Sequence, residues 1–260
     1  MDLTKYGPWA LVVGSSEGVG ECFARKLAAD GFDLVLTARR AESLEPLAQD
    51  LRQLGREIRT LSLDLTEPDA LAKARTITDG LEVGLLAYVA GVVATHGDFV
   101  RQDPDLHRRL VAINVTGQTD FTHHYGAAMC DRGRGGMIVV GSMGSFIGSP
   151  NLSVYCAVKA FSRIFCEGLW LECQPHGVDV LHMCIGFTAT PAMRRIGIDT
   201  SMAASPDAVA QEALDKIALG PVLLAGGEPT RARAITYSQV DNRARTVRAS
   251  VIQLTASEEA

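Results

Sequence analysis

A glycine-rich turn between a short apolar run and a helical pattern constrains this chain more than any other feature. The run Trp9 to Val13 predicts a buried strand, and the pattern after the turn predicts a helix to Gly31. Glycines allow a ligand to approach the backbone closely, and a helix start offers free N–H groups to a pyrophosphate. This order favours a dinucleotide site over the alternative, a purely structural turn. The expected contacts are Gly14, Ser16, Glu17, Gly18, Val19 and Gly20.

The end of the second strand indicates which dinucleotide binds. The apolar run 33–37 is followed by Ala38, Arg39 and Arg40. An acidic residue here would bind the ribose hydroxyls of NAD, whereas arginines suit the 2'-phosphate of NADP. We therefore predict NADP(H), with Arg39 as the main contact and Arg40 as the second, and NAD(H) as the alternative cofactor. The rival interpretation is that the arginines only open a solvated helix.

Strands and helices alternate along most of the chain, which predicts an α/β fold. Strands are expected at 9–13, 33–37, 58–63, 84–89, 137–140, 178–185 and 222–224. Helices are expected at 41–54, 105–129 and 206–219, with another that carries Tyr155 and ends near Gln174. Right-handed crossovers then give a doubly wound parallel sheet of about seven strands in the order 3-2-1-4-5-6-7, with helices on both faces. We expect a single domain over residues 1–260.

Two segments stand outside this alternation. The connection 186–205 is long for a compact domain, so we expect a substrate loop or lid there. The C-terminal extension 229–260 has apolar residues at helical three-four spacing, which predicts an amphipathic helix lying on this subunit or on a partner. Those apolar positions are Val240, Ala244, Val247, Val251 and Leu254.

Four polar residues are candidates for chemistry. Tyr155 and Lys159 lie four residues apart on a predicted helix, so the ammonium can favour the ionised phenol and make it an acid or base. Ser142 follows the strand 137–140, where its hydroxyl can hold a carbonyl oxygen. The alternative is an ordinary half-buried tyrosine beside a solvated lysine. Asn114 is unfavourable inside a helix, which suggests a specific role or a local bend, although chance remains a rival explanation.

Composition excludes several classes of function. The net charge is -5 and the pI about 5.7, so nothing attracts the chain to nucleic acid or to an anionic membrane. The longest nearly apolar run, 83–94, is shorter than the about 20 residues that cross a bilayer. The start of the chain lacks a signal-peptide pattern, so we expect a cytoplasmic protein. Six cysteines without a C-x-x-C pair indicate neither a disulfide framework nor a metal site.

These residues together resemble the short-chain dehydrogenase/reductase family from about Trp9 to Leu224. The positions that carry the resemblance are Gly14, Gly18, Gly20, Asp64, Ala90, Gly91, Asn114, Ser142, Tyr155, Lys159, Gly186 and Thr190. The resemblance implies a Rossmann-type fold. It also implies further cofactor contacts at Asp64, Leu65, Ala90, Gly91, Tyr155, Lys159, Gly186, Thr188 and Thr190.

The resemblance implies roles for the polar residues. Tyr155 would be the general acid or base, and Ser142 would orient the substrate oxygen. Lys159 would lower the pKa of the tyrosine and bind the nicotinamide ribose, and Asn114 would hold a water in a proton relay. A mostly apolar substrate pocket is expected, with contacts from Val93, Met143, Phe146, Phe187 and Met193.

Three positions depart from the family pattern. Val13 stands where the family usually has threonine, Tyr88 and Val89 where it has two asparagines, and Ile185 where it commonly has proline. The first two departures should weaken hydrogen bonds that support the central sheet, and the third should alter the wall beside the nicotinamide. None removes a catalytic group.

The combined prediction is an NADP(H)-dependent oxidoreductase that interconverts a carbonyl and a secondary alcohol on a hydrophobic small molecule. The alternatives are a regulatory protein that senses NADP(H) without turnover, and a related lyase or epimerase. A homodimer or homotetramer is expected.

Overall fold

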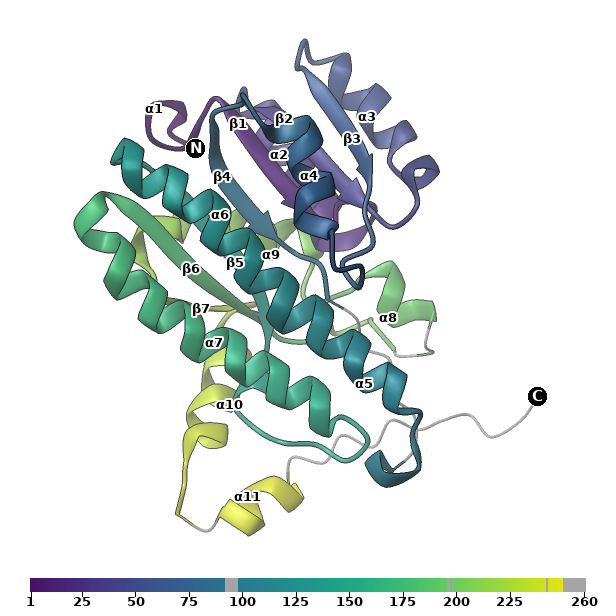
Figure 1. Ribbon diagram of the computed structural model, residues 1–260. Coiled ribbons are helices and arrows are strands. Elements are labelled where there is room, and N and C mark those ends of the chain that lie inside the picture. Colours follow the sequence, from purple (N-terminus) through teal and green to yellow (C-terminus); the bar gives the residue numbers. More distant parts are fainter. Residues whose placement is uncertain (92–97, 196, 198, 242, 250–260) are drawn as a thin grey trace.

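Seven parallel strands form one sheet in the order β3-β2-β1-β4-β5-β6-β7, as predicted (Figure 1). The structure is a computed structural model and describes residues 1–91, 98–195, 197, 199–241 and 243–249. The strands are β1 (Trp9–Val13), β2 (Asp33–Ala38), β3 (Ile58–Ser62), β4 (Val83–Tyr88), β5 (Gly135–Ser142), β6 (Val178–Ile185) and β7 (Val222–Ala225).

Helices cover both faces of this sheet (Figure 1). The described α-helices are α1 (Leu3–Tyr6), α2 (Gly18–Ala29), α3 (Glu45–Arg52), α4 (Ala70–Thr78), α5 (Pro104–Val111), α6 (Gly117–Arg132), α7 (Ser153–Cys173), α8 (Pro191–Arg195), α9 (Pro206–Lys216), α10 (Glu228–Ser238) and α11 (Arg243–Ala249). Apolar side chains of α2, α3 and α9 pack into a core on one face. Those of α4, α6 and α7 pack into a second core on the other.

The near-continuous apolar strands follow from this double covering. Every residue of β1 is buried, and its side chains alternate between the two cores. Ala10 and Val12 join one core, whereas Leu11 and Val13 join the other, because successive side chains of a strand point to opposite faces. A parallel strand covered on both faces therefore needs apolar residues at each position.

Two predicted helices are divided in the structure. The segment 41–54 begins with a 3-10 turn at Ala41–Ser43, after which α3 starts with a proline in its first turn. The predicted helix 105–129 consists of α5, a π-helical turn at Ala112–Thr116, and α6. Asn114 lies within this π-helical turn.

The described part of the C-terminal extension is helical in two pieces, and the predicted apolar positions Ala244 and Val247 lie on the second of them. It forms α10 and α11, and Val240 lies between them with 79% of its surface exposed. Val251 and Leu254, which completed the predicted apolar face, lie outside the described residues. The three-four spacing therefore did not account for the break after α10.

Candidate active site

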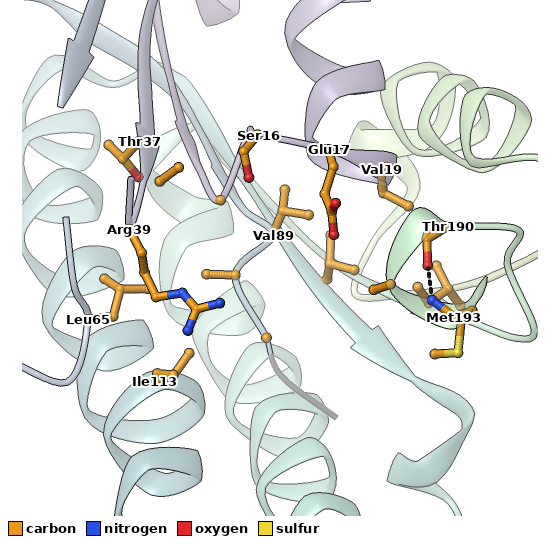
Figure 2. A pocket seen from close by; sticks show the side chains of 18 of the residues that line it. Ser16, Glu17, Val19, Thr37, Arg39, Leu65, Val89, Ile113, Thr190 and Met193 are labelled. Carbon is orange, nitrogen blue, oxygen red and sulfur yellow. Dashed lines mark hydrogen bonds between the residues drawn. The ribbon is translucent and has the colours of Figure 1, made fainter. Parts of the chain in front are cut away.

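A cavity of about 420 Å³ lies at the carboxyl ends of the strands, where the strand order reverses between β1 and β4 (Figure 2). In doubly wound sheets this reversal opens a crevice for ligands. Many of the predicted cofactor residues line it: Gly14, Ser16, Glu17, Gly18, Val19, Arg39, Asp64, Leu65, Ala90, Gly91, Tyr155, Lys159 and Thr190. The other predicted cofactor and catalytic residues lie outside its lining: Gly20, Arg40, Asn114, Ser142, Gly186 and Thr188.

The glycine turn is shaped as a close-approach site. Gly14 has a φ of +91°, and a Cβ there would lie 2.9 Å from the backbone of Ala90. At Gly20 a Cβ would lie 2.0 Å from the carbonyl oxygen of Gly14. A side chain at Gly20 would therefore clash with the glycine turn, against which the first turn of α2 packs. The side chain of the N-cap residue Glu17 makes no capping hydrogen bond to α2, so this helix end fits the pyrophosphate of a dinucleotide.

Arg39 and the segment after β3 form one end of the cavity. Figure 2 shows the Arg39 side chain pointing into the cavity, which Leu65 also lines. The Asp64 carboxylate accepts hydrogen bonds from the backbone N–H and the hydroxyl of Thr66, at 2.9 and 2.7 Å. These bonds, the backbone one first, hold the pKa of Asp64 below its ordinary value. Asp64 thus lines the cavity while it stabilises its own turn.

Tyr155 lines the cavity, and Ser142, the last residue of β5, lies near it. A Cβ on Gly144 would lie 3.3 Å from Tyr155 Cε1 and 3.6 Å from Ser142 Oγ, which accepts a hydrogen bond from the N–H of Gly144 at 3.1 Å. Burial raises the pKa of Tyr155 to about 12, and the nearby Ser142 hydroxyl opposes part of this rise. The phenol is therefore protonated at neutral pH, as a proton donor must be.

Lys159 and Asn114 lie beside this pair. The Lys159 ammonium donates to the carbonyl oxygen of Val140 at 3.1 Å, and burial lowers its pKa to about 8. The amide of Asn114 donates to the carbonyl oxygen of Leu110 at 2.9 Å, whereas its Oδ1 is buried without a partner among the described residues. A Cβ on Gly91 would lie 3.0 Å from Lys159 Nζ and 3.4 Å from that oxygen. The three residues therefore border one small polar space.

Tyr88 supports the turn that carries Asn114, a role that the sequence pattern missed. Its buried hydroxyl donates to the carbonyl oxygen of Ile113 at 2.6 Å, inside the π-helical turn. Gly117 makes room for this hydroxyl, since a Cβ there would lie 2.8 Å from it. The support that we expected to weaken at Tyr88 is thus replaced by a different hydrogen bond. The sequence signal for this hydrogen bond was a tyrosine at the end of a strand that otherwise consists of glycine and aliphatic residues.

The loop 186–205 contributes α8 to the rim of the cavity. Thr190 accepts a hydrogen bond from the N–H of Met193 at 3.3 Å, and both residues line the cavity (Figure 2). The Thr188 hydroxyl donates a hydrogen bond to the carbonyl oxygen of Gly186 at 3.2 Å. The Arg195 guanidinium bonds the Glu17 carboxylate, which ties α8 to the glycine turn.

Of the predicted substrate contacts, the structure brings Met193 to the cavity. Met143 accepts a long contact from the Cys184 thiol at 3.9 Å, and Phe146 lies under the Arg163 guanidinium at 4.7 Å from its ring centre. Phe187 lies beneath Arg233 at 6.0 Å. Met143, Phe146 and Phe187 therefore make contacts of their own and do not line the cavity. Val93 lies outside the described residues.

Further lining residues come from the strand ends. They are Thr37 and Ala38 of β2, Val89 after β4, Val140 and Gly141 of β5, and Ile185 of β6. The general position of ligands at the carboxyl ends of parallel strands would have identified them. Ile185, which replaces the usual proline, lies in the wall as expected.

The described part of the chain contains neither a metal-binding cluster nor a membrane-spanning helix. No three metal-binding side chains cluster among the residues that the structure places. None of the helices described here is both long enough and apolar enough to cross a bilayer.

The family model described as short chain dehydrogenase matches residues 8–200, which include the sheet from β1 to β6 and the whole cavity. The chain belongs to this family of oxidoreductases. Among its relatives, the 7beta-hydroxysteroid dehydrogenase of Clostridium sardiniense is 36% identical over 188 residues, or 72% of each chain. The enzyme of the same name from Collinsella aerofaciens is 34% identical over 84% of this chain and 80% of its own.

Solved structures of other short-chain dehydrogenases share the fold. A structure from a study of 7beta-hydroxysteroid dehydrogenase stereoselectivity superposes with a TM-score of 0.89 at 29% identity, covering 95% of this chain and 98% of the other. A short-chain dehydrogenase from Sphingobium yanoikuyae in complex with NADPH has a TM-score of 0.79 at 29% identity, covering 97% and 99%. The chain is thus similar over nearly its full length to oxidoreductases with a Rossmann-type sheet.

Proposed function

We propose that the chain is an NADP(H)-dependent dehydrogenase that interconverts a secondary alcohol and a ketone on a bulky hydrophobic molecule of the hydroxysteroid kind. The observation that carries this proposal is the convergence of Ser142, Tyr155, Lys159 and Asn114 beside the dinucleotide-shaped cavity. The substrate class is supported by the two relatives that are named 7beta-hydroxysteroid dehydrogenases.

The preference for NADP(H) is supported by the end of β2. Arg39 extends into the cavity there, and no acidic residue stands at the strand's last position or the two that follow. A guanidinium binds phosphate with charge-assisted hydrogen bonds that ribose hydroxyls cannot match. The neighbour from Sphingobium yanoikuyae, which was solved with NADPH, agrees with this choice.

The chemistry is divided between the cofactor and the protein. A bound nicotinamide supplies or accepts the hydride, which none of the protein side chains can do. In reduction, Ser142 and Tyr155 hold the carbonyl oxygen and the phenol donates a proton to it. Lys159 stabilises the phenolate that results, and its ammonium lies 6.0 Å from the tyrosine ring centre. The free oxygen of Asn114 orients a water that passes a second proton, taken from solvent, through Lys159 to the Tyr155 phenolate.

A ketone panel with NADPH tests this function through the absorbance of the reduced nicotinamide. We expect turnover of steroid ketones and of large cyclic ketones. Along a homologous ketone series, each added methylene should raise kcat/KM several-fold, because burying one contributes about 0.8 kcal/mol. A series that is flat or falling, or a preference for sugars and charged acids, would refute the hydrophobic substrate class.

We also propose that the chain self-associates in the cytosol through α5 and α7. This is supported by exposed apolar side chains of these helices at Val111, Phe161, Ile164 and Leu171. The cytosolic location is supported by six cysteines that are all free thiols. Replacing Ile164 with glutamate should shift the mass measured by light scattering toward the monomer, whereas Leu54→Glu on another exposed apolar position should not. An unchanged mass for Ile164→Glu would contradict this interface.

A further inference from the structure

Glu17 places a negative charge in the cavity to which we assign the phosphates of the cofactor. It lines the cavity at the start of α2, and Figure 2 shows its side chain pointing inward from the glycine turn. A carboxylate in this place repels a phosphate ligand, since like charges oppose one another even through water. The residue therefore acts against binding unless its charge is neutralised.

Capping of α2 does not account for Glu17. It occupies the N-cap position with extended backbone, yet its side chain makes no hydrogen bond to the N–H groups of the helix. Its two carboxylate oxygens instead accept from Arg195, with Nη1 to Oε2 at 2.7 Å and Nη2 to Oε1 at 2.5 Å. The start of α2 stays free for an anion while Glu17 is turned toward α8.

Arg195 belongs to the same cavity, which it lines from α8. The hydrogen bonds from Arg195 are the main reason that the pKa of Glu17 lies below its ordinary value, and the charges of Arg195, Arg40 and Arg39 add to them. Among the described residues no acidic group forms an ion pair with Arg39 or Arg40. The Glu17 carboxylate thus lies in the same cavity as two cations that suit a phosphate-bearing ligand, Arg39 and Arg195.

We infer that Glu17 is an internal competitor of the cofactor's phosphates, which holds Arg195 in the free protein and lowers the affinity for the dinucleotide. Arg195 neutralises Glu17, and a bound phosphate shares Arg195 with the carboxylate or displaces the carboxylate from it. The side chains are 37% and 62% exposed, so the pair is solvated and can exchange its partner. This inference rests on the proposed function only in taking a dinucleotide as the ligand.

Binding of NADPH to Glu17→Gln, Arg195→Gln and the double variant tests the inference. Nicotinamide fluorescence gives the dissociation constant, and stopped-flow displacement gives the release rate. We expect Glu17→Gln to lower the dissociation constant about three- to tenfold and to slow release, as removal of a half-exposed like charge should. Arg195→Gln should weaken binding by a similar factor, because Glu17 is then unpaired. The double variant should return close to wild type.

Glu21→Gln is the matched control. Glu21 lies in the first turn of the same helix, but it bonds Arg25 at 2.9 Å and does not line the cavity. Its removal should leave the dissociation constant of NADPH unchanged. The gain for Glu17→Gln should also shrink as salt is added, since screening weakens the repulsion that it removes. If Glu17→Gln does not fold, Glu17→Ser removes the charge and places a favoured N-cap residue at the helix start.

An equal or higher dissociation constant for Glu17→Gln would overturn the inference, as would a double variant in which the two effects add independently. The proposed function fails in a different way. If the wild type binds NADPH but reduces no ketone, the function is wrong while the binding comparison stands. If it binds only NADH, the cofactor preference is wrong and the same comparison is made with NADH.

Discussion

Replacing the imidazole of His182 with a ring that does not titrate should make the protein more resistant to acid. This histidine lies on β6 with no exposed surface, and neither ring nitrogen has a hydrogen-bond partner among the described residues. The ring fills the space over Gly141, where a Cβ would lie 2.1 Å from two of its atoms. Burial lowers the pKa of His182 to about 3, and the charges of Lys159 and Arg163 act in the same direction.

The sign of the effect follows from where the proton binds. The ordinary pKa of 6.5 applies to His182 in the unfolded chain. Between pH 6.5 and about 3, His182 therefore binds a proton in the unfolded state but not in the native state. The free energy of unfolding therefore falls as the pH falls through this window. One pKa unit corresponds to about 1.4 kcal/mol, so the loss from this residue is about 2 kcal/mol between pH 7 and pH 5.

Urea unfolding of wild type and His182→Phe at pH 7, 6 and 5 measures this loss. Phenylalanine keeps a ring over Gly141 but does not titrate, and it removes two buried nitrogens without partners. The free energy of unfolding should fall by about 2 kcal/mol less in the variant than in wild type over this range. His123→Phe, at an exposed position on α6, should keep the wild-type slope. Parallel pH dependences for wild type and His182→Phe would refute the reasoning.

Three other changes test the candidate site. Tyr155→Phe should lower kcat by at least about 100-fold, because it removes the general acid, and should leave the dissociation constant of NADPH close to that of wild type; unchanged NADPH oxidation would contradict the mechanism. Arg39→Ala should raise the dissociation constant of NADPH at least about tenfold and that of NADH little, since a charge-assisted contact contributes about 1.5 to 3 kcal/mol; equal losses would contradict the cofactor assignment. Gly91→Ala should lower kcat about tenfold, because the added methyl group displaces Lys159 and Asn114, and should leave the Tm near that of wild type. Full activity of this variant would show that catalysis does not depend on the space between these two side chains.

The sheet could be predicted in full because its signals are local and repeated. Each central strand is a short apolar run, and the run for β1 is bounded by the glycine turn that places the cavity. Tyr155 and Lys159 could be predicted to share one face of a helix because they lie four residues apart, and Ser142 could be predicted to lie at a strand end. These features need no knowledge of distant contacts.

The features that the sequence left undetermined depend on distant contacts. The bond from Arg195 to Glu17 joins residues 178 positions apart, and that from Tyr88 to Ile113 spans 25. Neither leaves a pattern in hydrophobic spacing. The same limit applies to the C-terminal extension, where the three-four spacing of Val240 and Ala244 continued across a break that separates α10 from α11.

The π-helical turn at Ala112–Thr116 also changes how this part of the chain should be compared with relatives. A π-helical turn holds one residue more than an α-helical turn. A relative in which this turn is α-helical would therefore be one residue shorter between α5 and α6. The gap in such an alignment belongs within Ala112–Thr116, so that both flanking helices stay aligned with their counterparts.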